Sequence, residues 1–289
     1  MSFLGKAKQK LKYILPPGIK KVLKYVFYSI QDAVAFITGK RNKEYPPKRL
    51  NFVGSSEFKK IGNEFLQYFK QYGHITPRDV VLDIGSGIGR MAIPLTHYLD
   101  ADTGAYYGFD IDKRGIAWCV HNITSRYPHF HFQYVDIYNK YYNKKGGIQA
   151  DEFTFPYKDK QFDFIFATSV FTHMLPAQIK RYLQEISRVL KPEGKVLLTF
   201  FSIDENAQKN MKEGHSYCQF SYSYGSDKTC FYSHKDMPEA ETGYTEDWII
   251  KQLKKEGIDD QLKMYHGSWS GRDDAHSYQD IICARKRTH

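Results

Sequence analysis

The sequence predicts an α/β protein with a doubly wound, seven-stranded, mostly parallel sheet behind a helical N-terminal arm. Three observations support this fold class. Short apolar runs alternate with amphipathic segments from residue 79 onward, the first run ends in a glycine-rich loop, and basic residues concentrate before residue 50. Alternation of strand and helix patterns is typical of a parallel sheet with helices on both faces.

The predicted elements follow one another along most of the chain. Strands are expected at the apolar runs 79–84, 105–110, 130–135, 162–167, 195–201, 262–266 and 278–284. Helices are expected where apolar residues recur at steps of three and four, at 57–72, 89–99, 112–127, 176–190 and 245–256. The last strand should return antiparallel to its neighbours.

Positive charge is concentrated in the predicted N-terminal arm, residues 1–48. Residues 1–50 contain twelve Lys or Arg against two acids, which is the whole net charge of +10, so residues 51–289 are formally neutral. Apolar residues between 19 and 37 form one stripe of a basic amphipathic helix. Two interpretations stay open: the stripe makes peripheral contact with a membrane, or it packs against the domain that follows.

The cysteines and the hydropathy pattern indicate the compartment. Four scattered cysteines are too few for a disulfide framework, and no run approaches the roughly 20 apolar residues that span a bilayer. The first residues also lack the apolar run of a signal peptide. A cytoplasmic protein is expected, with the membrane's inner face as the place of any peripheral contact.

The glycine-rich loop Asp83–Arg90 is the central motif. A dinucleotide site has the pattern G-x-G-x-x-G, but the third glycine here, Gly89, comes one place early. The Gly-Lys-Ser/Thr of a phosphate-binding P-loop is also missing. What remains is a D-x-G-x-G-x-G loop at the carboxyl end of a buried strand, where open α/β sheets bind ligands.

This loop resembles the first motif of class I S-adenosylmethionine-dependent methyltransferases, in particular those that act on small molecules and glycans. The resemblance extends over about residues 51–289, with acids ending the second strand at Asp110 and following the third at Asp136. It implies S-adenosylmethionine as the cofactor, Asp110 on the ribose hydroxyls with Asp112 as the alternative, and Asp136 on the adenine amino group. A carboxylate with two acceptor oxygens suits a vicinal diol. The full implied cofactor set is Asp83, Gly85, Ser86, Gly87, Gly89, Arg90, Asp110, Ile111, Asp136, Ile137 and Thr168.

His173, just after the fourth predicted strand, is the candidate catalytic residue. Methylation of a hydroxyl needs a general base, and histidine is the usual one near neutral pH. The alternative is that His173 only orders its loop. No metal is expected, because the spacing of His215, Cys218, Cys230 and His234 matches no standard zinc site.

The segment 202–243 is longer than the fold requires and is predicted to be a substrate lid that contains a β-hairpin. Aromatic residues of this lid and of the loop before the last strand are the candidate substrate contacts: Tyr217, Tyr222, Phe231 and Trp269. For Trp269, ordinary packing is the alternative.

The expected function is methyl transfer to a small-molecule, glycan or lipid-linked acceptor, at oxygen before nitrogen. A nucleic-acid substrate is disfavoured, because the family's Pro-Pro motif for base amino groups is replaced by Thr168-Ser169-Val170-Phe171. Two alternatives are kept: a cofactor-binding module without catalysis, and an RNA methyltransferase guided by the basic arm. The sequence carries no signal for the oligomeric state.

Overall fold

The computed structural model describes residues 17–40, 42, 44–50 and 57–288, and side chains from residue 25 onward. Contacts divide the chain into two compact units, one up to Lys59 and one from Lys60 onward. The predicted division lay at 48/49. Residues 1–16 of the predicted basic arm, and the side chains of the first part of its stripe, lie outside the described residues.

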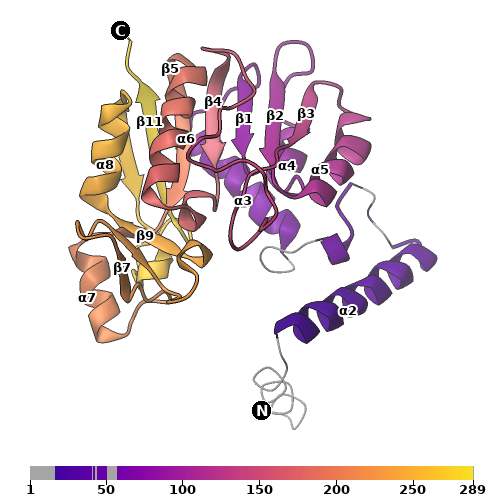
Figure 1. The fold of residues 1–289 in the computed structure, drawn as a ribbon. Coiled ribbons are helices and arrows are strands. Elements are labelled where there is room, and N and C mark those ends of the chain that lie inside the picture. The colour runs from indigo at the N-terminus through magenta and orange to yellow at the C-terminus, as the bar shows by residue number, and fades with distance from the viewer. Residues whose placement is uncertain (1–16, 41, 43, 51–56, 289) are drawn as a thin grey trace. The chain divides into compact units, whose positions relative to one another are not determined.

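The first unit is built around helix α2 (Pro17–Ile37), as the apolar stripe predicts (Figure 1). Proline suits the first turn of a helix, because its missing N–H would be unpaired there, and Gly39 with φ of 67° follows the end. The Asp32 carboxylate accepts from the backbone N–H groups of Lys48 and Arg49 at 2.8 and 3.1 Å and so fixes the short helix η1 (Lys48–Leu50). Among the described helices, none has the length and apolar content needed to cross a membrane.

The second unit contains a seven-stranded sheet with the order β10-β11-β5-β4-β1-β2-β3. Its strands are β1 (Val80–Ile84), β2 (Ala105–Asp110), β3 (Phe130–Tyr134), β4 (Phe162–Ala167), β5 (Leu190–Phe200), β10 (Ile258–Tyr265) and β11 (Asp280–Lys286). The strands from β5 to β3 pair in parallel, whereas β11 runs antiparallel to both β5 and β10. The predicted doubly wound sheet and its reversed last strand are confirmed.

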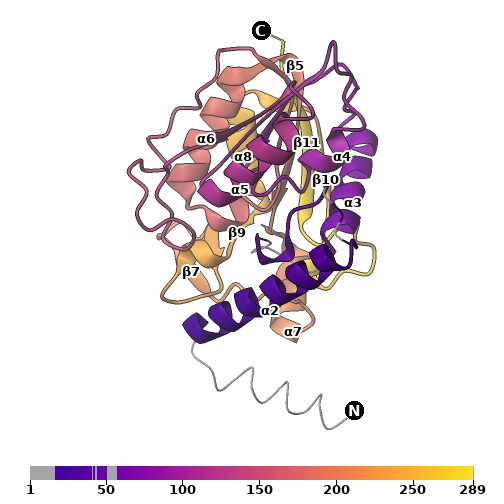
Figure 2. The same ribbon diagram turned by 90° about the vertical axis from the view of Figure 1, so that its right-hand side faces the viewer.

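Helices cover both faces of this sheet (Figures 1 and 2). The helices are α3 (Phe58–Gln71), α4 (Ala92–Leu95), α5 (Lys113–Cys119), α6 (Pro176–Val189) and α8 (Glu246–Lys255). α6 and α8 lie on one face and α3 and α4 on the other. The largest apolar core joins α6 and α8 to the sheet through fully buried residues such as Leu183, Ile186 and Leu253.

Two predicted helices are shorter in the structure. The helix expected at 89–99 is reduced to α4. It begins late because Gly89 lies in the left-handed region and Pro94 has no N–H to donate to the carbonyl of residue 90. The helix expected at 112–127 ends as α5 and continues as one wide turn, the π-helix η2 (Val120–Thr124).

The predicted lid segment folds as a separate small sheet of four strands in the order β6-β9-β8-β7. The strands are β6 (Ser202–Ile203), β7 (Tyr222–Tyr224), β8 (Cys230–Tyr232) and β9 (Thr242–Thr245). Helix α7 (Glu205–Glu213) lies between β6 and β7 in the sequence. Strands β7 and β8 pair antiparallel, so the predicted hairpin is confirmed, although both strands are short. Because β6 follows the end of β5, this sheet lies at the carboxyl edge of the large sheet (Figure 1).

Candidate active site

The glycine-rich loop turns away from the end of β1 and is tied to the neighbouring strand. The N–H groups of Gly85 and Ser86 both donate to the carbonyl of Phe109 at 3.0 and 3.1 Å. Gly85, Gly87 and Gly89 have φ of 79°, 54° and 78°, the left-handed region that favours glycine. The spacing of the three glycines therefore sets the path of the loop.

The space around each glycine differs. A Cβ at Gly85 would lie 2.5 Å from Val170 Cγ2, so the segment after β4 passes directly against the loop. A Cβ at Gly89 would lie 3.0 Å from Cys119 Sγ, under α5. At Gly87, in contrast, nothing lies within 4 Å of an added Cβ. Gly87 is thus the point where a ligand can approach the backbone.

Asp110, at the end of β2, holds this point of the loop. Its Oδ2 accepts from the Gly87 N–H at 2.7 Å and its Oδ1 from the Asp112 N–H at 2.6 Å. Burial is the main cause that raises the pKa of Asp110, and the two N–H donors oppose it. Asp112, the alternative in the sequence interpretation, caps α5 by accepting from the Arg114 N–H at 3.1 Å.

Asp83 lies beneath the loop with only 1% of its surface exposed. The Tyr106 hydroxyl donates to its Oδ2 at 2.6 Å, whereas its Oδ1 and the buried Ser86 Oγ have no hydrogen-bond partner among the described residues. Burial raises the pKa of Asp83 to about 8, Asp110 adds to the rise, and the Tyr106 hydrogen bond opposes it. Such orphaned buried oxygens are rare in proteins and indicate a missing hydrogen-bond partner.

The adenine side of the predicted site lies after β3. The Val135 N–H donates to the Asp110 carbonyl at 3.1 Å and so brings the two strand ends together. Asp136 is exposed, and its carboxylate accepts from the Tyr134 hydroxyl at 2.7 Å and the Gly147 N–H at 3.1 Å, which lower its pKa. Of the other predicted residues, Ile137 follows β3 and is buried, and Ile111 follows β2 and is partly buried. Thr168 after β4 and Arg90 at the end of the glycine loop are also partly buried.

His173 belongs to the short helix η3 (Phe171–His173). This helix directly follows Val170, the residue that packs against Gly85. Its Nδ1 lies 3.2 Å from the Glu239 carbonyl, and because a carbonyl only accepts, the proton is on Nδ1. Its Nε2 is therefore an acceptor, 3.4 Å from the Tyr142 hydroxyl. Burial lowers the pKa of His173, so the neutral form dominates near neutral pH.

Residues that the sequence interpretation did not select surround this histidine. Tyr141 and Tyr142 lie on a turn after β3 with 51% and 45% of their surface exposed, and both rings contact the imidazole. Asn139 shapes the turn by accepting from both tyrosine N–H groups at 2.9 Å. Burial is the main cause that raises the pKa of Tyr142 to about 12, and the charges of Tyr141 and Asp110 add to the rise.

Glu239 anchors the turn to the lid segment. Its buried carboxylate accepts from the Lys140 N–H at 3.1 Å and from Gln178 Nε2 at 3.2 Å, while its backbone carbonyl holds His173. Lid, turn and histidine are thus joined by one residue.

The predicted substrate contacts are dispersed. Tyr217 is 77% exposed, and Tyr222 stacks on Tyr232 with centroids 5.4 Å apart. Phe231 is half-buried against a small core. Trp269 is fully buried in that core, where its Nε1 donates to Asp280 at 2.6 Å. In this structure Trp269 is therefore a packing residue, the alternative given for it above.

Among the described residues, one group has metal-ligand chemistry: Asp204, Glu246 and His266 bring ligand atoms within 4.8 Å of one another. Arg272 pairs with Asp204, and Asp280 raises the pKa of His266, so these side chains form an ion-pair network. Of the suggested zinc ligands, Cys218 instead donates to Glu241 at 3.4 Å.

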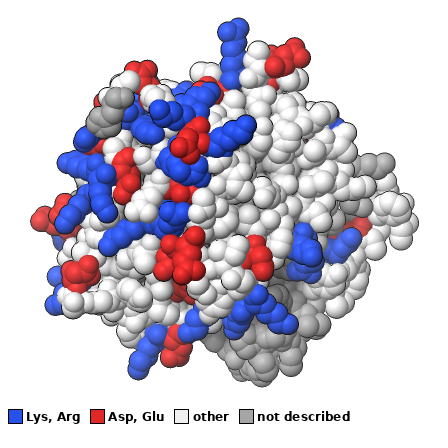
Figure 3. Space-filling view, turned by 45° about the horizontal axis from the view of Figure 1, so that its top comes forward, with Lys and Arg blue, Asp and Glu red and all other residues white. Residues whose placement is uncertain are grey.

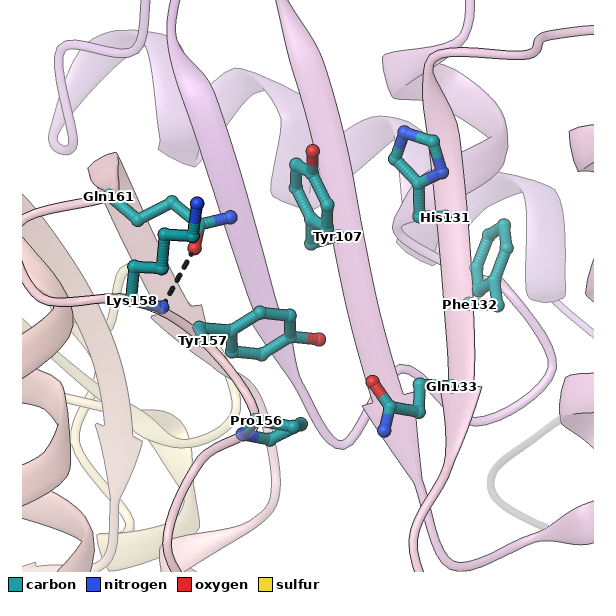
Figure 4. Close-up of a pocket in the computed structure, with 8 residues that line it drawn as sticks. All are labelled: Tyr107, His131, Phe132, Gln133, Pro156, Tyr157, Lys158 and Gln161. Atoms are coloured by element: carbon teal, nitrogen blue, oxygen red, sulfur yellow. Dashed lines mark hydrogen bonds between the residues drawn. The ribbon is translucent and has the colours of Figure 1, made fainter.

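A hollow of about 450 Å³ opens on the other face of β2 (Figure 4). Its lining consists of Tyr107, His131, Phe132, Gln133, Pro156, Tyr157, Lys158 and Gln161. Tyr107 and Asp110 point to opposite faces, because strand side chains alternate. The hollow shares no residue with the predicted cofactor set, and it is not the site at the loop.

Comparison with known proteins agrees with this geometry. The family model described as "Methyltransferase domain" matches residues 82–198, from β1 to β5. A 2-phytyl-1,4-naphtoquinone methyltransferase of Trichormus variabilis is 30% identical over 132 residues, which cover 46% of this chain and 51% of that protein. The chain thus spans about half the length of this curated relative.

Solved structures share the fold. The PH0226 protein from Pyrococcus horikoshii OT3 has a TM-score of 0.55 and 15% identity, over 83% of this chain and 95% of that one. The [4+2]-cyclase SpnF has a TM-score of 0.53 and 16% identity, over 83% and 86%. At such identities the likeness shows the fold alone. Since a cyclase shares it, the reaction must be argued from the site.

Proposed function

We propose that this chain is a class I S-adenosylmethionine-dependent methyltransferase that transfers the methyl group of that cofactor to an oxygen of a small-molecule acceptor; the matched methyltransferase domain at residues 82–198 supports this. The observation that carries the choice of oxygen is His173, a neutral histidine whose tautomer is fixed by Glu239 and which lies one turn from the glycine loop. Oxygen acceptors need such a base, because a neutral hydroxyl is a weak nucleophile.

The residues at the loop fit S-adenosylmethionine by their chemistry. Open space above Gly87 and the remaining lone pairs of Asp110 suit a ribose diol. The orphaned, buried Asp83 Oδ1 and Ser86 Oγ suit the polar amino acid end of the cofactor. Asp136 and Ile137 remain the proposed adenine contacts. When bound, the cofactor supplies a methyl group on a sulfonium, which reacts readily once a nucleophile is aligned.

His173 then performs the proton transfer. Its Nε2 lone pair accepts the hydroxyl proton of the acceptor, while its Nδ1–H stays bonded to the Glu239 carbonyl. The imidazolium that forms is stabilised by that carbonyl and by the nearby Glu241 carboxylate, both of which favour the charged form. In the free protein, the Tyr142 hydroxyl is near the position that the acceptor hydroxyl would take.

A planar, uncharged acceptor is the preferred class. The exposed rings of Tyr141 and Tyr142 offer an aromatic surface beside the base. The acids Asp110 and Glu241 act electrostatically on Tyr142 and His173, which disfavours an anionic acceptor. The name of the Trichormus relative specifies a naphthoquinone with a phytyl group, which also favours a small aromatic acceptor.

The experiment is a transfer assay with methyl-labelled S-adenosylmethionine and a panel of naphthoquinols, simple phenols and sugars. We expect label on an oxygen of an aromatic acceptor. His173→Gln should lower kcat by about 10²- to 10⁴-fold, the usual contribution of a general base. His131→Gln, in the hollow on the other face of β2, is the matched control and should leave kcat unchanged.

The pH profile tests the role of His173 independently. Because burial lowers its pKa, the base stays neutral below the ordinary histidine value of about 6.5. The rate should therefore be constant near neutral pH and fall only at more acidic pH, and this acidic limb should vanish in His173→Gln. If the rate of the variant still falls at acidic pH as in the wild type, a group other than His173 causes that fall.

The non-catalytic alternative has a distinct outcome. Tight binding of the cofactor without turnover on any acceptor of the panel, and no effect of His173→Gln on binding, would favour a module that binds the cofactor for another purpose.

A further inference from the structure

Tyr106 and Asp83 form a buried pair beneath the glycine loop. The hydroxyl of Tyr106 donates to Asp83 Oδ2 at 2.6 Å, and the two residues have 0% and 1% of their surface exposed. The β1–β2 register places Asp83 opposite Gly108, so Tyr106, two residues earlier, lies on the same face of the sheet. Its phenol reaches along the strand to the carboxylate.

Gly108 makes this reach possible. A Cβ at Gly108 would lie 2.9 Å from Tyr106 Oη and 3.0 Å from its Cε1, closer than real Cβ contacts. On the other side, the ring of Tyr106 stacks on Phe130 with centroids 5.0 Å apart and an interplanar angle of 15°. The phenol is thus held in one position by packing from β2 and β3.

The hydrogen bond gives the two carboxylate oxygens different roles. Oδ2 is occupied by Tyr106, whereas Oδ1 is buried with no partner among the described residues, and the same is true of Ser86 Oγ above it. A buried carboxyl oxygen without a hydrogen-bond partner is costly, and the cost disappears when the group ionises and a ligand brings a donor. The fixed geometry therefore presents one oxygen to the loop.

The groups around Asp83 set its charge. Tyr106 and Asp110 face it from β2, and it acts electrostatically on Cys119 of α5 and on Tyr157. All four are neutral or acidic, and burial also favours the protonated form of Asp83. The pKa of Asp83, at about 8, leaves the free protein mainly protonated there at neutral pH.

We propose that Tyr106 is a positioning residue for the cofactor: it fixes Asp83 so that Oδ1 receives the ammonium group of the cofactor's amino acid end. This inference rests on the proposed function. Asp83 gives up its proton to solvent as the ammonium binds, so binding is coupled to the release of one proton. The coupling of cofactor binding to proton release arises from Tyr106 and Asp83, and it requires no contact between Tyr106 and the cofactor.

The test measures binding rather than turnover. Titration calorimetry with S-adenosylhomocysteine, which keeps the amino acid end but cannot transfer methyl, is carried out from about pH 6 to about pH 8.5 in buffers of different ionisation enthalpy. The wild-type protein should release close to one proton near pH 7, and its affinity should rise toward pH 8.

Tyr106→Phe keeps the ring packing and removes only the hydroxyl. Since the hydrogen bond lowers the pKa of Asp83, its loss should move the rise in affinity to higher pH and weaken binding at pH 7 by about 10-fold, the effect of moving the pKa by one unit. Tyr107→Phe, the neighbour on the opposite face of β2, is the control and should bind as the wild type does.

Asp83→Asn is the second variant. It should bind S-adenosylhomocysteine weakly, with neither proton release nor pH dependence. This variant keeps the inference testable if Tyr106→Phe folds poorly. Equal affinity and proton release in wild type and folded Tyr106→Phe would overturn the inference while leaving the proposed function intact. No binding of S-adenosylhomocysteine by wild type at any pH would overturn both.

Discussion

At the scale of single residues, the strand end beneath the glycine-rich loop contains an acid whose burial lowers the stability of the fold. Asp83 is buried, accepts one hydrogen bond and keeps one oxygen unpaired. In the unfolded chain its pKa returns to an ordinary value of about 3.9. The folded protein therefore binds this proton more tightly, and the protein loses stability as pH rises from the unfolded pKa through the folded value of about 8.

Asp83→Asn should stabilise the unliganded protein. The amide is a neutral counterpart of the protonated acid and can still accept from Tyr106, so the pH-dependent loss is removed. We expect a gain on the order of a few kcal/mol at pH 8 that shrinks as pH approaches 4. Urea unfolding at several pH values measures it. A gain that is the same at every pH would contradict the assignment to Asp83.

Gly108→Ala should do the opposite. The added Cβ would lie 2.8 Å from Ser86 Cβ and 2.9 Å from Tyr106 Oη, so either the loop or the ring must shift. Overpacking of this kind costs about 1–3 kcal/mol, which denaturant unfolding can measure. Adding Ser86→Gly removes the first contact and should recover part of the loss. If the double variant recovers nothing, the clash lies elsewhere.

At the scale of elements, the proposed active site depends on contacts between segments that are far apart in the sequence. The turn at 139–143, helix η3 and the lid segment before β9 meet through Glu239, whose carboxylate and carbonyl bind two different elements. The lid is therefore part of the support of the proposed base, in addition to any contact with the acceptor.

Glu239→Ala should weaken both stability and catalysis. It removes the partly buried hydrogen bond from the Lys140 N–H, and one such bond typically contributes about 0.5–1.5 kcal/mol. The loosened turn should also lower kcat more than it raises KM, because the base is less well placed. Glu152→Ala is the control, because Glu152 is an exposed acid in the β3–β4 connection that also contains the turn. A stability loss with unchanged kcat would separate the anchor from catalysis.

At the scale of the whole molecule, charge is divided between the two units. Residues 51–289 are formally neutral, and in Figure 3 Lys and Arg side chains intermingle with Asp and Glu over much of one side. The excess of +10 belongs to residues 1–50. Within the first unit, the apolar residues Phe27, Ile30 and Val34 of α2 are exposed.

We expect the 289-residue protein to bind vesicles that contain anionic lipid. Basic residues attract the surface and an apolar helix face enters the interface. Binding should weaken with salt, since the Debye length falls to about 8 Å at 0.15 M. The double variant Phe27→Ser, Val34→Ser should reduce cosedimentation several-fold. Equal binding to neutral vesicles, or an unaffected double variant, would refute the prediction.

The sequence by itself determined the sheet, the loop and the acids at the strand ends. Buried strands appear as continuous apolar runs, and the carboxyl ends of parallel strands meet at one edge, so Asp83, Asp110 and Asp136 were expected together at that edge. Their roles toward the cofactor came from the family resemblance and stay predictions. Helix 89–99 was predicted too long because the pattern of apolar residues outweighed Pro94.

Only the tertiary structure decided the partners of these residues. Lys140 and Glu239 are 99 positions apart, His173 and Glu239 are 66 apart, and Tyr106 reaches Asp83 across two strands. No periodicity connects such residues, because their approach depends on how the elements pack. For the same reason Trp269, an aromatic residue in a loop, was a candidate substrate contact in the sequence and is a fully buried core residue in the fold.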